Sequence, residues 1–214
     1  MNDSQTRIVP VDGAALPADL VVPSGARGVV VFAHGSGSSR LSPRNRAVAS
    51  ALRARGAFGT LLFDLLTPAE DRSYENRFDI DTLTRRLVAA VKWCSDRPEC
   101  AGLTLGLFGA STGAAAALGA AAKLGREIGA VVSRGGRPDL AGPLLGTVTA
   151  PTLLIVGGLD TQVIELNRIA FAALASPVKR LEIVPGATHL FEEPGTLDDV
   201  VRLSIGWFEA HLAT

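Results

Sequence analysis

The sequence predicts one α/β domain, built on a mostly parallel sheet with helices on both faces. Short apolar segments typical of strands alternate along the chain with helical segments, and the connectors between them are short. Hydrophobic residues make up 47% of the 214 residues and charged residues 20%, which suits strands that are buried on both faces. A chain of this length can bury one sizeable core and is short for two, so we expect a single domain over residues 1–214.

The elements of the first half are placed by hydrophobic spacing and by helix-start signals. The β-branched run at 29–31 is typical of a buried strand, and Pro43 is favoured in the first turn of a helix. Leu83, Leu87 and Val91 recur at helical spacing. In order, we expect a hairpin of strands at 7–11 and 20–22, a strand at 28–33, a helix at 43–55, a strand at 59–64 and a helix at 80–93.

The second half begins with an uncharged stretch at 101–122, which we assign to a strand and a helix rather than to a membrane span. Five glycines interrupt this stretch, and its hydrophobic spacing changes from strand-like to helical. We expect a strand at 103–110, a helix at 112–124, strands at 128–132 and 151–156, a helix at 163–174, a strand at 178–184 and a closing helix at 197–212.

The turn between the strand at 103–110 and the following helix reads Gly109-Ala110-Ser111-Thr112-Gly113. Glycines allow a sharp bend and a close approach of neighbouring backbone, so the Ser111 hydroxyl would stand clear of the sheet. At a helix N-terminus, free N–H groups and the helix dipole favour developing negative charge. Ser111 is therefore the candidate nucleophile. The alternative is a glycine-rich turn whose serine only caps the helix.

Two later loops supply the groups that a nucleophilic serine requires. Asp160 and His189 each follow a late apolar strand. A serine hydroxyl needs an imidazole as its base, and the imidazole needs a carboxylate to fix its tautomer. We therefore expect Ser111, His189 and Asp160 to act as nucleophile, base and orienting acid. Asp64 and, more weakly, Glu165 compete for the last role.

The loop after the strand at 28–33 is rich in glycine and serine and reads His34-Gly35-Ser36-Gly37-Ser38-Ser39. In this arrangement an oxyanion is held by the backbone N–H after the nucleophile and by one N–H from this loop. We expect the N–H groups of Thr112 and Ser36 to fill these roles, with Gly37 as the other candidate for the second. His34 is expected to brace the loop by hydrogen bonding rather than to act as the base.

These motifs resemble those of the small α/β-hydrolases of the dienelactone-hydrolase-like group, and the resemblance extends from about Leu20 to Leu212. It implies a three-layer sandwich of seven to eight strands and hydrolysis of carboxylic esters through an acyl-serine. Dienelactone hydrolases carry a cysteine nucleophile where this chain has Ser111, so dienelactone itself is not implied as the substrate. The matching segments are His34-Gly35-Ser36-Gly37, Gly109-Ala110-Ser111-Thr112-Gly113, Gly158-Leu159-Asp160 and Ala187-Thr188-His189-Leu190-Phe191.

The substrate is expected to be a small ester in an open site. Many α/β-hydrolases insert a helical lid at the position of residues 133–150, but this interval has room only for a loop and one short helix, so we expect no lid domain. The alternatives to ester hydrolysis are hydrolysis of a lactone, thioester or small amide, acyl transfer to an acceptor other than water, and a hydrolase-like scaffold that only binds a ligand.

Several arginines are candidates for binding an anionic group of the substrate. Arg134 and Arg137 follow the strand expected beside the nucleophile strand, at the edge where open α/β sheets bind ligands. Either one, or Arg40 after the oxyanion loop, would bind a carboxylate or phosphate by paired hydrogen bonds. Gly37 would line the same pocket. The alternative is that Arg134 or Arg137 pairs with Asp139.

Composition argues against several partners and cofactors. The formal net charge is zero and Lys and Arg are scattered, so we expect neither a nucleic-acid nor a membrane partner. The three histidines lie on separate segments without metal-ligand spacing, so we expect no metal and no organic cofactor. Cys94 and Cys100 are expected to be free thiols. Residues 1–5 lack the features of a secretion signal, which favours a cytoplasmic location, and the oligomeric state is left open.

Overall fold

The computed structural model describes residues 6–212. Its strands are β1 (Thr6–Val11), β2 (Ala14–Val21), β3 (Val29–Ala33), β4 (Gly59–Phe63), β5 (Leu105–Ala110), β6 (Ile128–Arg134), β7 (Thr152–Gly157) and β8 (Lys179–Val184). Its α-helices are α1 (Pro43–Arg55), α2 (Ile80–Ser95), α3 (Thr112–Leu124), α4 (Thr161–Ala173) and α5 (Thr196–His211). The bounds predicted for the helices at 43–55 and 112–124 are confirmed.

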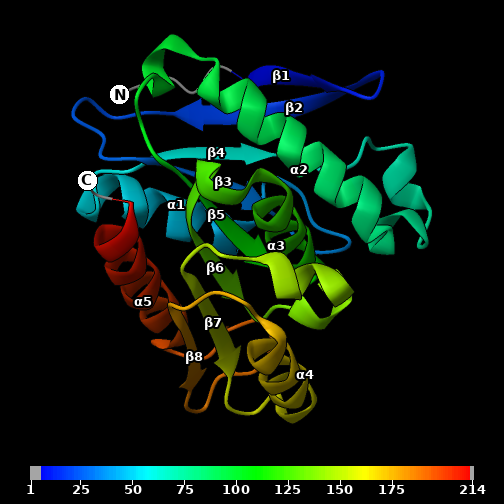
Figure 1. The fold of residues 1–214 in the computed structure, drawn as a ribbon, viewed down its shortest axis with the longest axis vertical. Coiled ribbons are helices and arrows are strands. Elements are labelled where there is room, and N and C mark those ends of the chain that lie inside the picture. The colour runs from blue at the N-terminus through cyan, green and yellow to red at the C-terminus, as the bar shows by residue number, and fades with distance from the viewer. Residues whose placement is uncertain (1–5, 213–214) are drawn as a thin grey trace.

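The eight strands form one sheet between two layers of helices (Figure 1). The strand order is β1-β2-β4-β3-β5-β6-β7-β8. The hairpin β1–β2 and the pair β2–β4 are antiparallel, and every other pair is parallel. The predicted three-layer α/β fold with a mostly parallel sheet of seven to eight strands is therefore confirmed.

Each face of the sheet is covered by its own apolar core. Val31 and Leu107 point to the face that packs against α2, α3 and α4, whereas their neighbours Phe32 and Phe108 point to the face that packs against α1 and α5. The rings of Phe32 and Phe108 lie 4.9 Å apart between centroids. Because consecutive strand residues alternate between two buried faces, the central strands have continuous apolar sequences.

Two of the differences between the observed and the predicted strand bounds have a physical reason. β6 continues through Ser133 and Arg134, because these polar residues pair with Leu154 and Ile155 of β7 and the ladder extends past the apolar run. The second strand of the opening hairpin begins at Ala14 rather than at residue 20. A tight turn at Asp12-Gly13, where both residues have positive φ, lets it pair with β1 at once.

The uncharged stretch at 101–122 divides between β5 and α3, as predicted. No helix within residues 6–212 combines the length and the apolar character needed to cross a bilayer. The interval after β6 contains a run of 3₁₀ turns over Pro138–Thr147, interrupted at Gly142. This run packs on α3 and α4 rather than over the end of the sheet, so the expectation of no lid domain is confirmed for the described residues.

An ion pair between the buried Arg86 and the partly exposed Glu70 ties the segment after β4 to helix α2. Arg86 donates from both terminal nitrogens to the carboxylate of Glu70, at 2.6 and 2.8 Å, and also to the carbonyl of Leu65. The Arg86 hydrogen bonds, together with those from Thr67, lower the pKa of Glu70 to about 2. This pair holds in place the segment that runs from the end of β4 past the oxyanion loop.

We predict that this pair makes stability depend on pH below about 4.5. A carboxylate whose pKa is depressed in the folded state stabilises the fold above its unfolded-state value of about 4.3, and the contribution is lost as the pH falls towards the folded value. Glu70→Gln should therefore flatten the acid limb of a plot of unfolding free energy against pH. The exposed Glu75→Gln is the control. An unchanged acid limb in the Glu70 variant would contradict the assignment.

We also predict that one glycine fixes how closely α3 approaches β3. A Cβ at Gly113 would lie 2.3 Å from the Ala33 carbonyl oxygen and 2.5 Å from that of His34. Gly113→Ala should lower the unfolding free energy by about 1–3 kcal/mol, as for other overpacked sites. Gly206→Ala in α5 meets no atom within 4 Å and should instead stabilise by about 0.5–1 kcal/mol. Equal effects in urea denaturation would contradict this account.

Candidate active site

Ser111 stands at the junction of β5 and α3 with a strained backbone. Its φ of 51° and ψ of −123° are rare for a residue that carries a Cβ, and such conformations cost about 1–3 kcal/mol. Backbone hydrogen bonds hold it there. The Ser111 N–H donates to the carbonyl of Arg134 at 3.3 Å, and the Ser111 carbonyl accepts from Arg137 and Ala114, each at 3.0 Å. The end of β6 therefore fixes the turn from both sides.

Glycines around Ser111 allow this crowding. A Cβ at Gly109 would lie 2.4 Å from the Cα of Ala114. The sharp turn from β5 into α3 therefore requires a glycine at this position. A Cβ at Gly35 would lie 2.9 Å from the Ser111 Cβ and 3.7 Å from its Oγ. The loop after β3 thus lies directly against the serine, as the sequence predicts for an oxyanion loop.

His189 and Asp160 form a direct hydrogen bond. Asp160 lies at the start of α4 after β7, and its Oδ2 is 2.7 Å from Nδ1 of His189 in the loop after β8. The absence of a side chain at Gly157 allows the close approach of these loops, because a Cβ there would lie 2.5 Å from the carbonyl oxygens of Ala187 and Thr188. With Nδ1 bound to the carboxylate, Nε2 is the ring nitrogen left for another partner.

Ser111 and His189 line the same hollow at the carboxyl edge of the sheet, with a volume of about 250 Å³. Among the described residues, the Ser111 hydroxyl makes no hydrogen bond, so the serine and the imidazole line the same hollow without a hydrogen bond between them. Catalytic hydrogen bonds are often long without substrate and shorten in the complex. The geometry therefore provides a serine, an imidazole and a carboxylate at one edge, with the last two already bonded.

The backbone donors expected for an oxyanion are available. Within residues 6–212, the N–H groups of Thr112, Ser36 and Gly37 have no protein acceptor. Thr112 and Ser36 line a second, smaller hollow beside Gly35, adjacent to the one that contains Ser111. Free N–H groups at the start of α3, together with the helix dipole, favour negative charge at this position.

His34 braces the loop after β3, as predicted. Its Nδ1 lies 2.9 Å from the carbonyl of Gly35, and its Nε2 accepts from the N–H of Leu65 at 3.0 Å. These partners require a proton on Nδ1 and none on Nε2. Burial lowers the pKa of His34, which keeps the ring neutral. Both nitrogens are occupied, so this histidine is not available as a base.

Arg134 brings a buried positive charge to the hollow that Ser111 lines. Arg134 is only 6% exposed, and no carboxylate of the described residues pairs with it. One terminal nitrogen donates to Oδ1 of Asn45 at 3.2 Å, the guanidinium lies 6.0 Å from the ring centre of Phe191, and Nε has no partner. Burial, and then the charge of Arg44, lower its pKa to about 10, so it remains protonated at neutral pH.

Two of these neighbours were not predicted from the sequence. Arg44 and Asn45, from the first turn of α1, line the hollow beside Arg134. Arg44 also forms an ion pair with the exposed Glu192, at 2.9 Å. The signal was present, because a helix that starts soon after the oxyanion loop must place its first turn near the carboxyl edge of the sheet.

The structure corrects the assignment of Arg40 to substrate binding. Its guanidinium donates to Asp64 at 2.7 Å and lies 3.5 Å from Asp19, and it does not line the hollow. Asp64 is thereby engaged with Arg40 and not with His189, and Glu165 pairs with Arg168. Neither competitor occupies the position of Asp160.

The question of which arginine pairs with Asp139 is also resolved. Arg137 forms two parallel hydrogen bonds to Asp139, at 2.9 and 2.8 Å, whereas Arg134 makes none to it.

Gly37 lies on the oxyanion loop, where a Cβ would be 3.6 Å from the Arg77 side chain, and does not line the hollow with Ser111. No group of three or more His, Cys, Asp or Glu side chains within residues 6–212 has the geometry of a metal site.

The comparison with known proteins identifies the family. No family model matches the chain. The structure is similar to the crystal structure of dienelactone hydrolase from Anabaena variabilis ATCC 29413, with a TM-score of 0.93 and 51% identity over 97% of each chain. The chain belongs to the α/β-hydrolase superfamily, in its dienelactone-hydrolase-like group. The resemblance inferred from the sequence motifs is therefore confirmed.

A more distant solved structure shares the fold alone. Est1E from Butyrivibrio proteoclasticus has a TM-score of 0.81 at 16% identity, over 98% of this chain and 99% of its own.

Two curated proteins of Mycobacterium tuberculosis, from strains CDC 1551 / Oshkosh and ATCC 25618 / H37Rv, are each named "Putative phosphoribosyl transferase". They are 58% identical over 204 residues, which is 95% of this chain but 44% of their own length. The chain thus spans less than half the length of these relatives.

Proposed function

We propose that this hydrolase cleaves small carboxylic esters, with Ser111 as nucleophile, His189 as base and Asp160 as the acid that orients it. The observation that carries the proposal is the 2.7 Å bond between Asp160 and His189, in a loop whose imidazole faces the same hollow as Ser111. A hydrogen-bonded carboxylate holds the imidazole in the tautomer that accepts a proton on Nε2. The strained backbone of Ser111 adds support, because strain of this kind is concentrated at active sites.

The reaction proceeds in two halves. His189 Nε2 takes the proton of Ser111 as the Oγ attacks the ester carbonyl carbon, and the N–H groups of Thr112 and Ser36 donate to the resulting oxyanion. Collapse of this intermediate breaks the bond to the alcohol oxygen, which leaves with the proton from His189. Water then attacks the acyl-serine with His189 again as base, and the carboxylic acid and free Ser111 are released.

Chemically similar substrates remain the nearest alternatives. The same machinery would hydrolyse a lactone, a thioester or a small amide, or would transfer the acyl group to another acceptor. A scaffold that only binds a ligand has no need of a strained serine beside a bonded imidazole–carboxylate pair. The two relatives named as phosphoribosyl transferases are more than twice as long as the segment that matches this chain. We propose that the transferase activity in their names belongs to the remaining part of their sequences.

We predict that Ser111→Ala abolishes turnover. Loss of the nucleophile should reduce kcat for a short chromogenic ester by at least about 10³-fold, as in other serine hydrolases. A fluorophosphonate should add one label to the wild-type chain, detected by intact mass, and none to the variant. Ser38→Ala removes another hydroxyl that lines the same hollow and should keep both the activity and the label. Labelling of Ser111→Ala at the wild-type rate would refute the assignment.

We further propose that the favoured ester carries a carboxylate or phosphate that binds Arg134. Burying a guanidinium without a carboxylate partner costs folding free energy, and an anion bound in the hollow would reduce that cost. The lowered pKa of about 10 is consistent with a cation that lacks a partner. Asn45 and Phe191 hold the guanidinium plane in place, and Arg134 lines the hollow in which an anion would bind.

We predict that Arg134→Gln changes selectivity more than activity. A charge-assisted hydrogen bond contributes about 1.5–3 kcal/mol, so kcat/KM for an acidic ester should fall about 10–100-fold, with little change for a neutral ester of equal size. Arg137→Gln, whose arginine is already paired with Asp139, should leave the ratio of the two rates unchanged. An equal loss for both esters in Arg134→Gln would contradict the role of this arginine while leaving the serine mechanism intact.

A further inference from the structure

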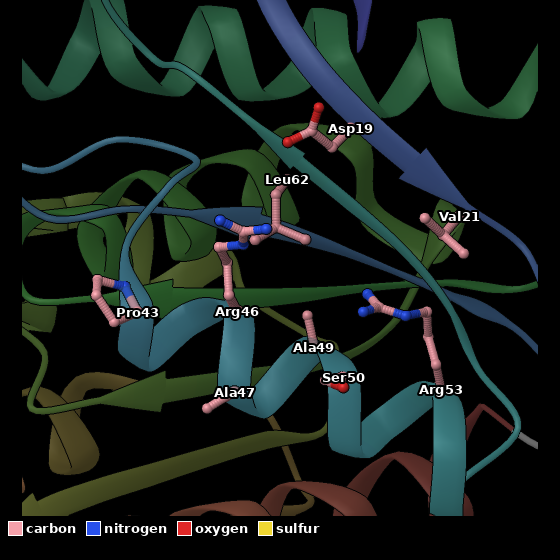
Figure 2. Close-up of a pocket in the computed structure, with 9 residues that line it drawn as sticks. All are labelled: Asp19, Val21, Pro43, Arg46, Ala47, Ala49, Ser50, Arg53 and Leu62. Carbon is pink, nitrogen blue, oxygen red and sulfur yellow. The ribbon is translucent and has the colours of Figure 1, made fainter. Parts of the chain in front are cut away.

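A larger hollow lies away from Ser111, between helix α1 and the strands β2 and β4 (Figure 2). Its volume is about 390 Å³, within the range of small-molecule sites and greater than that of the hollow beside Ser111. None of its lining residues has a role in the proposed reaction.

The floor of this hollow is formed by two antiparallel strands. Asp19 pairs with Leu62, and Val21 pairs with Thr60, so their side chains share one face of the sheet. Val21 and Leu62 supply an apolar surface. Asp19, at one end, accepts from the Thr6 hydroxyl at 3.2 Å and lies 3.5 Å from Arg40. The negative charge of Asp19 is therefore already shared with Arg40.

Two guanidinium groups from α1 face this floor. Arg46 and Arg53 are seven residues apart, which places them on the same side of the helix with their Cα atoms about 10 Å apart. Both side chains project from α1 towards the strands (Figure 2). Arg53 donates to the Thr60 hydroxyl at 2.7 Å, and within residues 6–212 neither arginine forms an ion pair with a carboxylate. Two guanidinium groups and one carboxylate, that of Asp19, therefore line the hollow, and its net charge is positive.

The two charges also affect one another. Burial, and then the positive charge of Arg46, lower the pKa of Arg53. Two like charges that face the same space repel one another, and a bound anion would offset that repulsion. Planar guanidinium groups are well suited to phosphate oxygens, which they bind through paired hydrogen bonds.

We propose that this hollow is a second ligand site, which binds a phosphorylated small molecule. Arg46 and Arg53 bind the phosphate, and the organic part lies on Val21 and Leu62. The site is separate from the hollow beside Ser111. Asn45, the residue before Arg46, contacts Arg134, but successive helical residues point about 100° apart and so face different surfaces.

The test is calorimetric titration of the full chain with phenyl phosphate and with inorganic phosphate. Phenyl phosphate should bind more tightly, because its ring covers the apolar floor. Arg46→Ala and Arg53→Gln should each weaken its binding at least about tenfold, the equivalent of about 1.4 kcal/mol. Arg55→Ala, on the same helix but outside the hollow, is the matched control and should bind like the wild type. Arg134→Gln removes the other candidate anion site, so the binding that depends on Arg46 and Arg53 should remain, with unchanged affinity, in that variant.

Three results would overturn the proposal: no binding of phenyl phosphate at millimolar concentration, equal affinity in all the variants, or loss of binding in Arg134→Gln alone. The last would place the anion beside Ser111. Thermal unfolding of each variant shows whether it is folded, and Arg53→Gln retains a side-chain donor for Thr60. If both α1 variants unfold at lower temperature, addition of phenyl phosphate provides a second readout: it should raise the wild-type midpoint and not theirs.

Discussion

The backbone of Ser111 is held in a conformation that an isolated chain would avoid, and the arrangement of the site depends on the contacts that keep it there. Hydrogen bonds with Arg134, Arg137 and Ala114 fix the residue on both sides, and glycines at 35, 109 and 113 leave room for the neighbouring backbone. These contacts join β3, β5, β6 and α3 at one point. The cost of the strained turn is therefore offset by the packing of the central strands.

The parallel sheet then delivers the remaining groups to the same edge. The loops after β3, β6, β7 and β8 all leave from the carboxyl ends of their strands, so residues distant in sequence meet beside the serine. Gly157 allows the last two loops to come together, and Asp160 and His189 bond as a result. Arg134 reaches the hollow because β6 continues further than its apolar residues alone would suggest.

Much of this arrangement could be predicted from the sequence, because local signals agree with the fold. Pro43 and the glycine-flanked Ser111 mark the starts of α1 and α3, whose bounds were predicted to the residue. The end of β6 was missed, since pairing with β7 outweighs the polarity of Ser133 and Arg134. The pairing of Asp160 with His189 was predicted, but the partner of each arginine could not be decided from the sequence. Arg40, Arg134 and Arg137 all lie at or after strand ends, and the folded geometry pairs Arg40 with Asp64 and Arg137 with Asp139.

The most direct measurement of the central claim is a crystal structure of the chain after reaction with a fluorophosphonate. We expect phosphorus bonded to the Ser111 Oγ, with the phosphoryl oxygen about 3 Å from the N–H groups of Thr112 and of Ser36 or Gly37. We also expect His189 Nε2 to be turned towards the Oγ, with Asp160 still bonded to Nδ1. Phosphorus on another residue, or an imidazole that remains remote from the modified serine, would contradict it.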